Sequence, residues 1–271
     1  MAETLGPLRV PDVEAVQVAA ALKPIWGTET GSRTRGRLET VFHFAIARNW
    51  RPAGTNPAMA SVLKHLLPKP PRKEPQHYPA MPHQDVPAFI TLLRTRDGMT
   101  ARALQFQIFT ASRTGEVLWA TWEEINLKAG RWTIPAHRMK MKEPHMVPLT
   151  APVVELLEAL PRNGPYVFQN EKGKPFSNQV LIMLMRRAGY GQFVPHGFRS
   201  SFRDWAAEVA KADRQTAEAA LAHRIASGTE AAYLRSKLFD ARKGLMSEWA
   251  QYCLAVEKPG ANHCFGLAAA S

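Results

Sequence analysis

The stretch Thr110-Ala-Ser-Arg113-Thr-Gly-Glu116 is the first of five short polar stretches in the second half of this 271-residue chain. Together the five stretches supply two arginines, a lysine, two histidines and a tyrosine that could act as one site. None is diagnostic alone, because motifs of this length occur by chance on many helices. Their order along the chain therefore decides the interpretation. The other four are Met139-Lys140-Met-Lys142, His196-Gly-Phe-Arg199, Leu221-Ala-His223-Arg and Glu230-Ala-Ala-Tyr233-Leu-Arg.

These residue types are the ones that cleavage of a phosphodiester without a metal ion requires. The pentacoordinate phosphorus carries extra negative charge, which the planar and always protonated arginine side chain binds through two oxygens. A lysine can protonate the leaving oxygen, because its proton becomes mobile when the ammonium is desolvated. A tyrosine hydroxyl can attack phosphorus if neighbouring cations stabilise the phenolate. The sequence contains no metal-binding cluster, and we expect neither a metal ion nor a cofactor.

The charge of the chain favours a polyanionic partner. The formal net charge is +12 and the isoelectric point is about 10.0. Each phosphate that a basic side chain neutralises releases condensed counterions, so nucleic acid is the expected partner. A basic protein that is merely soluble, or one associated with the ribosome, is the alternative. Cys253 and Cys264 form no Cys-x-x-Cys pair, which argues against a disulfide framework and a zinc site.

The hydrophobic pattern predicts a mainly α fold with a small β-sheet, of the α+β class. No signal sequence or membrane span is recognised, so we expect a cytoplasmic, nucleoid-associated protein without a membrane partner. Strands are expected at 131–135 and 143–149, with basic residues between them. Apolar residues at helical spacing predict helices at 13–22, 29–49, 57–67, 86–96, 100–112, 151–160, 177–187, 198–210, 214–222 and 239–256.

The five stretches resemble the signature boxes of the tyrosine recombinase (phage-type integrase) family, most closely the integrases of prophages and genomic islands. The resemblance covers nearly the whole chain. Further segments that fit the same pattern are Leu22-Lys-Pro-Ile-Trp26, Thr28-Glu-Thr, Asn56-Pro-Ala, Trp132-Thr-Ile-Pro, Met139-Lys, His145-Met-Val-Pro-Leu149, Phe202-Arg-Asp-Trp205 and Met246-Ser-Glu-Trp249.

This resemblance implies that Arg113 and Arg199 clamp the scissile phosphate. Tyr233 would attack it, leaving a 3′-phosphotyrosyl bond that a second strand can reverse without ATP. Glu116 matches an acidic residue that orients the site rather than reacting. From the residues alone, Arg113 could simply pair with Glu116, and Tyr233 could be a packing aromatic.

The resemblance also implies three groups that move protons or donate hydrogen bonds. Lys140, on the turn between the two expected strands, would protonate the departing 5′ oxygen. Lys142 stays the alternative acid and a candidate DNA contact. His196 would assist proton transfer at the nucleophile, and His223 would donate a hydrogen bond to the phosphate. Taken alone, a histidine of this kind is more often a hydrogen-bonded core or surface residue than a catalytic one.

The domains follow from the same resemblance. We expect a partial helical core-binding domain at 1–71, a Pro/Lys-rich linker at 72–80, the catalytic domain at 81–258 and a disordered tail at 259–271. The resemblance begins near Pro7-Leu-Arg-Val, inside the core-binding domain, and an arm-binding domain is not recognised. We therefore expect a truncated or remnant integrase whose chemistry is intact but whose hold on DNA is weaker. The candidate DNA contacts in these parts are Arg33, Arg37, Lys69, Arg72 and Lys73, although the linker could also be a plain spacer.

The expected partner is double-stranded DNA at attachment (core) sites, and the expected activity is integration or excision of a mobile element. The departure Leu221-Ala-His223, where the family often has Leu-Gly-His, is minor because alanine is a good helix former. The segment 239–256 would join neighbouring subunits into a tetramer, or it would fold onto its own domain. Two other functions stay open: a DNA-binding remnant with little or no recombination, and a type IB topoisomerase.

Overall fold

The computed structural model describes residues 2–70, 79–223 and 230–255. For residues 230–237 it gives the helical backbone without the side chains. The chain divides into two compact units, Met1–Gln76 and His77–Ser271, which are described separately below. Most of the expected linker, including Arg72 and Lys73, and the whole expected tail lie outside the described residues. No helix within the described ranges is both long enough and apolar enough to cross a membrane.

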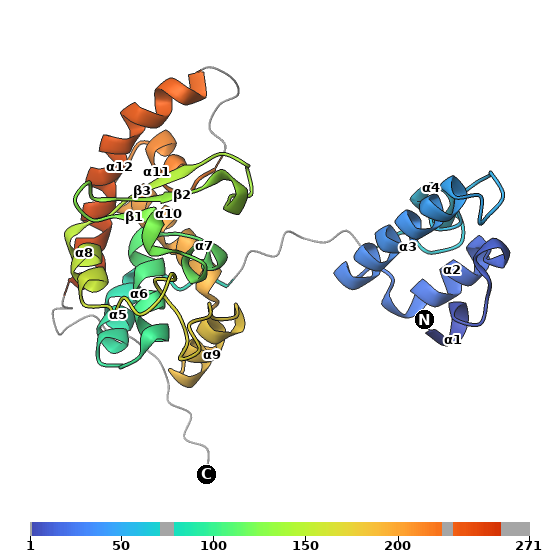
Figure 1. Cartoon of the computed structure of the whole chain (residues 1–271), viewed down its shortest axis with the longest axis horizontal. Helices are drawn as coiled ribbons and strands as arrows, with labels where there is room; N and C mark the ends of the chain where they lie inside the picture. Colours follow the sequence, from blue (N-terminus) through green and yellow to red (C-terminus); the bar gives the residue numbers. More distant parts are fainter. Residues whose placement is uncertain (1, 71–78, 224–229, 256–271) are drawn as a thin grey trace, which may run out of the picture. The chain divides into compact units, whose positions relative to one another are not determined.

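The first unit is a small helical module (Figure 1), in which α3 is the longest helix. The Thr28 side chain caps α3, as the sequence predicts, by accepting the Gly31 N–H at 3.0 Å. A Cβ on Gly31 would lie 2.2 Å from the carbonyl oxygen of Ile25, so only glycine allows this helix to start here. The helices of this unit are α1 (Ala2–Leu5), α2 (Ala15–Leu22), α3 (Glu29–Ala47) and α4 (Ala60–Leu63).

The prediction of a helix over 57–67 is too long, since α4 spans only Ala60–Leu63. The reason is a side-chain turn before it. The Asn56 carboxamide accepts the Ala58 N–H at 2.9 Å and donates to the Glu39 carbonyl at 2.8 Å. This local bonding competes with helical bonding and delays the helix by several residues.

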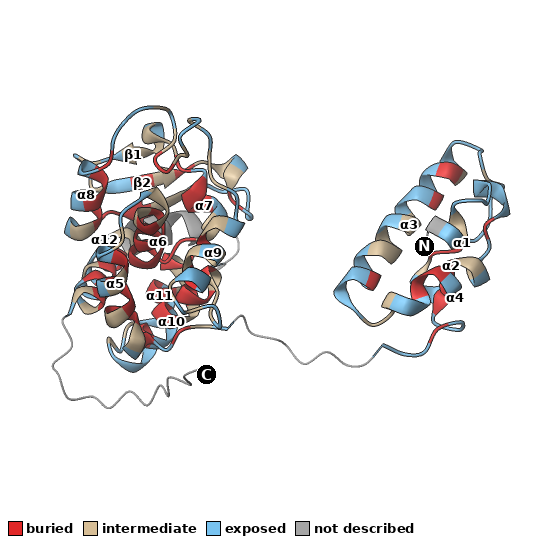
Figure 2. Ribbon diagram, turned by 90° about the horizontal axis from the view of Figure 1, so that it is seen from below, coloured by how far each residue is buried: buried red, intermediate tan, exposed pale blue. Residues whose placement is uncertain are grey.

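The second unit surrounds one central helix, α6 (Met99–Thr110), with other helices and a small sheet. Figure 2 shows α6 in the middle of this unit as an almost entirely buried element, and residues 103–110 are all buried. This arrangement explains why α6 is apolar on most sides rather than amphipathic. The remaining helices are α5 (Val86–Arg94), α7 (Thr114–Leu118), α8 (Ala151–Glu158), α9 (Gln179–Arg187), α10 (Phe198–Glu208), α11 (Arg214–Ala220) and α12 (Glu230–Leu254).

The sheet is antiparallel, and its strands lie in the order β1-β2-β3. The predicted hairpin is confirmed, with Trp132 opposite Val147 and Ile134 opposite His145. Trp132 is fully buried, and its ring centroid lies 5.2 Å from that of Phe106 in α6, which fixes the sheet on the core. The strands are β1 (Ile125–Asn126), β2 (Arg131–Ile134) and β3 (His145–Pro148). The mainly α fold with a small sheet is therefore confirmed.

The C-terminal helix is longer than predicted. It begins at Glu230, so the Tyr233 stretch forms its first turn. Its later residues pack on their own domain: Met246, Trp249 and Cys253 are buried, and the Trp249 indole donates to the Ile108 carbonyl at 2.8 Å. For the described side chains of α12 the structure thus shows a terminal helix folded onto its own domain, which is one of the two arrangements considered above.

Candidate active site

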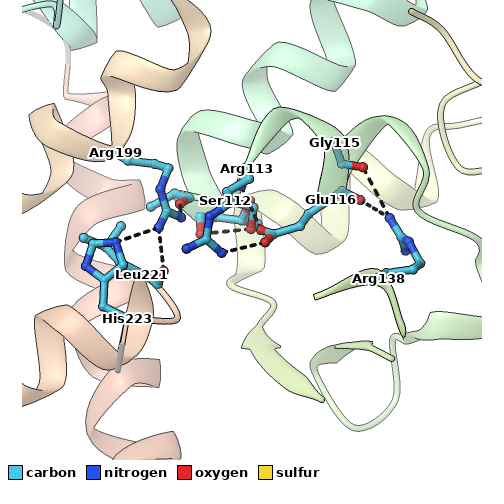
Figure 3. Close-up of polar contacts among 10 residues, drawn as sticks. Ser112, Arg113, Gly115, Glu116, Arg138, Arg199, Leu221 and His223 are labelled. Carbon is cyan, nitrogen blue, oxygen red and sulfur yellow. Dashed lines mark hydrogen bonds and ion pairs between the residues drawn. The ribbon is translucent and has the colours of Figure 1, made fainter. Parts of the chain in front are cut away.

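The first arginine of the site is placed by a sharp turn between α6 and α7. Ala111 ends α6 in the left-handed conformation, with φ of 48°, and Arg113 precedes the first residue of α7. The buried Glu116 carboxylate accepts the backbone N–H of Arg113 at 2.8 Å and its guanidinium Nη1 at 2.8 Å (Figure 3). The pairing of Arg113 with Glu116 is therefore present. It fixes the orientation of the guanidinium, which would otherwise be mobile in solvent.

The second arginine joins three segments that are distant in sequence. Arg199, in the first turns of α10, is buried and donates from Nη1 to the Ala111 carbonyl at 2.7 Å. Its Nη2 donates to the Leu221 carbonyl and lies 3.2 Å from Nε2 of His223 (Figure 3). These carbonyls belong to the residues that cap the C-termini of α6 and α11, where the negative end of the helix dipole favours a cation. Burial, and next the charge of Arg113, lower the pKa of Arg199 to about 10, so it stays protonated at neutral pH.

His223 lies between Arg199 and Glu218. Its Nδ1 is 2.5 Å from Oε2 of Glu218, and its Nε2 faces Nη2 of Arg199. A guanidinium can only donate, so Nε2 must be the acceptor, and the proton of the neutral ring is assigned to Nδ1, which donates to the carboxylate. The ring remains partly exposed, with 40% of its side-chain surface accessible.

His196 lies on a short 3-10 turn, Pro195–Gly197, and is half-buried. Burial lowers the pKa of its ring, and the nearby positive charges of Arg199 and Arg113 lower it further. A neutral imidazole at physiological pH is suited to accept a proton from a nucleophile. The charges of both arginines and of His223 act on the ring of His196, so these four residues belong to one cluster.

Two residues hold the turn of His196 in place. Gln107, fully buried in α6, donates to the Pro195 carbonyl at 2.9 Å and to the Thr114 hydroxyl at 3.2 Å. It thereby joins the segment before His196 to the segment after Arg113. Gly197 is required as glycine, because a Cβ there would lie 2.5 Å from the Pro79 carbonyl oxygen. Gln107 could not be found from the sequence, since its contact with the Pro195 carbonyl joins residues 88 positions apart along the chain.

The two candidate lysines lie on the connection between β2 and β3, and both are exposed. Buried Met139 anchors this connection, which turns back through the Lys142 N–H to the Met139 carbonyl at 3.1 Å. Its base is fixed by Arg138, which pairs with Glu124 and donates to the Glu116 carbonyl (Figure 3). Neither ammonium forms a hydrogen bond or ion pair with a described residue, so the structure does not choose between Lys140 and Lys142.

His145 is a further member of the cluster. In the sequence it begins the segment His145-Met-Val-Pro-Leu149, which resembles the family but predicts no role for this residue. Burial, followed by the charges of Arg242, Arg199 and Arg113, lowers the pKa of His145 to about 3. Its ring forms a hydrogen bond with the Ala220 backbone, which connects β3 to the end of α11. The signal that could have revealed it is the strand alternation, because His145 points to the same side as buried Val147.

The remaining predicted residues belong to the first unit or lie outside the described side chains. Tyr233 lies in the first turn of α12, and its side chain is not described. Arg33, Arg37 and Lys69 are exposed on the first unit, where Arg33 pairs with Glu29 at 2.7 Å. Over the described ranges, no group of three or more histidines, cysteines, aspartates or glutamates is arranged to hold a metal ion.

Comparison with solved structures and relatives agrees with this geometry. Prophage integrase IntA of Escherichia coli (strain K12) is 28% identical over 267 residues, which covers 93% of this chain and 62% of that protein. The chain thus spans less than two thirds of that relative. A lambda integrase(75-356) dimer bound to a COC′ core site has the same fold, with a TM-score of 0.59 and 17% identity over 82% of this chain and 83% of that chain.

A lambda integrase tetramer bound to a Holliday junction is similar in fold as well, with a TM-score of 0.57 and 17% identity over 81% of this chain and 66% of that chain. The model of the phage integrase central domain matches residues 1–61. The model of the phage integrase family matches residues 79–238, which is more than half of the chain. This chain therefore belongs to the phage integrase family.

Proposed function

We propose that the chain is part of a site-specific DNA recombinase that cleaves and rejoins DNA strands through a 3′-phosphotyrosyl intermediate. In the cell it would integrate or excise a mobile element. The observation that carries this proposal is the cluster of two guanidinium groups and two imidazoles that three stretches of the second unit bring together. Such a cluster provides fixed positive charge and proton-transfer groups at one point, which is what a phosphodiester in its transition state requires.

The proposed step begins with attack on phosphorus by the hydroxyl of Tyr233. The phenol proton passes to His196, whose neutral ring can accept it. Arg113 and Arg199 bind the nonbridging oxygens, and Glu116 keeps Arg113 in direction. The bond from phosphorus to the 5′ oxygen breaks, and Lys140 delivers the proton that this oxygen takes up. A free 5′ hydroxyl on a second strand then reverses the step and releases the tyrosine.

The proposed partner is double-stranded DNA at an attachment site. In this proposal residues 1–71 belong to the core-binding domain and residues 81–258 to the catalytic domain, in line with the two family models that match these parts. The exposed Arg33, Arg37 and Lys69 would contact the phosphate backbone, together with Arg72, Lys73 and Lys142. Since lambda integrase has been seen as a dimer on a core site and as a tetramer on a Holliday junction, assembly into a tetramer on DNA is proposed here too. Its place in the cell would then be the nucleoid.

The test is formation of a covalent complex on a suicide duplex that carries the junction sequence of the encoding element and a nick beside the cleavage position. The wild-type chain should form a complex that survives denaturing electrophoresis. Tyr233→Phe should bind the duplex with unchanged affinity and form no complex. A complex trapped on the Phe variant would refute the nucleophile assignment. Binding without any wild-type complex would favour the alternative, a DNA-binding remnant. Relaxation of supercoiled DNA that lacks paired sites would favour a topoisomerase.

A further inference from the structure

Glu218 contacts His223 through both its main chain and its side chain. The His223 N–H donates to the Glu218 carbonyl at 3.0 Å, and its ring Nδ1 meets the Glu218 carboxylate at 2.5 Å. The chain reaches this position through Ala222, whose φ of 49° turns it back over the end of α11. His223 is thereby held against its own helix, and the orientation of its ring is fixed from the Nδ1 side.

The start of α11 is also fixed, so the carboxylate is carried by a defined helix. Asp213 caps α11 by accepting the Thr216 N–H at 2.9 Å and the Thr216 hydroxyl at 3.1 Å. Glu218 is partly buried, with 24% of its side-chain surface accessible. Such a contact differs from an ion pair between two flexible surface side chains, which usually contributes little.

The two hydrogen bonds of His223 set a requirement for any contact with a phosphate. In the free protein Nε2 accepts from Arg199, so it carries no proton to donate. Moving the Nδ1 proton to Nε2 would leave a lone pair facing the Glu218 carboxylate, which is unfavourable. Uptake of a second proton from water avoids this conflict. The resulting imidazolium would donate from Nδ1 to Glu218 and from Nε2 to a phosphate oxygen.

We infer that Glu218 is a positioning residue for the proposed reaction, which holds His223 in one orientation and stabilises the imidazolium that donates to the scissile phosphate. This inference rests on the proposed function. The other charged or titratable groups that face His223 in the described part of the chain are Arg199 of α10 and His196 of the 3-10 turn. Arg199 is positively charged and disfavours a further positive charge, whereas His196 is neutral, so Glu218 is the group that offsets Arg199.

The first experiment needs no DNA and therefore tests the pair independently of the proposed function. Ring ¹⁵N spectra of the histidine-labelled chain are recorded against pH, with the His223 signals assigned from His223→Gln. Wild type should show the proton of the neutral ring on Nδ1. Glu218→Gln can still accept that proton but carries no charge, so the ring should keep its tautomer and take up a second proton less readily than in wild type. Glu218→Ala should lose both effects. Glu158→Gln, an exposed glutamate on α8, is the matched control and should change neither.

The second experiment measures single-turnover cleavage of the same suicide duplex between pH 5 and 9. Cleavage by Glu218→Gln should be slower by about tenfold or more, the scale found for carboxylate partners of metal-ligating histidines. Its rate should decline at a lower pH than that of wild type, because the imidazolium is lost earlier as pH rises. Unfolding by urea checks that the variant is folded.

Three results would overturn the inference. An unchanged protonation pH of His223 in Glu218→Gln would show that the carboxylate does not act on the ring. A lowered protonation pH with an unchanged cleavage rate would show that it does not act on the reaction. A slower rate with an unshifted pH profile would indicate a structural role only. Absence of cleavage by wild type would instead count against the proposed function, and the ring spectra would still decide the role of Glu218 toward His223.

Discussion

Arg242 in α12 donates a hydrogen bond from Nη1 to the carbonyl oxygen of Met146 in β3 over 2.8 Å. Its side chain is buried, and burial lowers its pKa to about 10, so the charge persists at neutral pH. The helix that starts with the Tyr233 stretch is thereby tied to the strand that follows the two candidate lysines. This contact thus joins the two elements nearest to a proposed nucleophile and a proposed acid.

Replacing Arg242 by leucine should lower the free energy of unfolding by about 1–3 kcal/mol, because the Met146 carbonyl loses its donor in a desolvated position. Amide hydrogen exchange should become faster along α12. The adjacent Lys243 is exposed, so Lys243→Leu is the matched control and should leave the exchange of α12 unchanged. Equal exchange in the two variants would show that the Arg242 contact does not hold α12 on the sheet.

Replacement of two glycines by alanine should change the free energy of unfolding in opposite directions. At Gly197 the added Cβ would lie 2.5 Å from the Pro79 carbonyl oxygen and 2.8 Å from the Ala80 Cα, and such overpacking against backbone costs about 1–3 kcal/mol. At Gly244, inside α12, it would have no neighbour within 4 Å, so the gain in helix propensity should stabilise the fold by about 0.5–1 kcal/mol. Urea unfolding of Gly197→Ala and Gly244→Ala measures both. A stabilised Gly197→Ala would contradict the close approach to Pro79.

His145 should make the fold sensitive to acid. Its pKa is lowered from 6.5 to about 3 in the folded state, so between these values the unfolded chain binds a proton that the native chain does not. The free energy of unfolding therefore falls as pH decreases from about 6.5 toward 3, by up to about 1.4 kcal/mol per pH unit for this one group. A series of urea unfolding curves at different pH values measures this slope. In His145→Gln it should be smaller by the contribution of close to one proton, about 1.4 kcal/mol per pH unit. His196, whose pKa is also lowered, contributes in the same direction in both proteins. An identical slope in the two proteins would mean that His145 protonates without cost in the native state.

Strand cleavage should continue in the presence of EDTA. In the proposed reaction the cations that stabilise the phosphorus are Arg113 and Arg199, and the proton for the 5′ oxygen comes from a lysine. Covalent-complex formation on the suicide duplex, measured with and without chelator, should differ by less than about twofold. Abolition by EDTA and recovery with Mg²⁺ would indicate a metal-dependent nuclease instead.

Much of the fold could be predicted from the sequence, because periodicity and capping are local signals. Thr28 marks the start of α3, and the alternation around Trp132 marks the hairpin. The elements that were missed are those with too few residues to show a period: α7 spans five residues and β1 spans two. The start of α12 was also missed, since the segment from Glu230 to Lys237 is polar and shows little apolar periodicity.

The candidate site, like the fold, could be predicted only in part. The order of the stretches predicted a cluster of six residues. Arg113, His196, Arg199 and His223 do lie together. Lys140 is exposed on the connection between β2 and β3, and the side chain of Tyr233 is not described. Glu116, the partner of Arg113, was also expected from the sequence. The other partners were not found, because each acts through a contact that folding alone creates. Gln107 reaches a carbonyl 88 residues away, and Arg242 reaches one 96 residues away. Glu218 is local, yet its relation to His223 depends on the left-handed turn at Ala222, for which alanine gives no signal.

Because Arg199 is clasped by the main-chain oxygens of Ala111 and Leu221, its rotamer is settled when the chain folds rather than when a ligand arrives. A long cationic side chain normally loses conformational entropy when it binds a ligand, but Arg199 has already lost it on folding. Its affinity for an anion should therefore be higher than that of a mobile arginine. Anion binding by Arg199 therefore also depends on local order. If the end of α11 frays, the guanidinium loses its hydrogen bond to Leu221, and anion binding should weaken well before the whole domain unfolds.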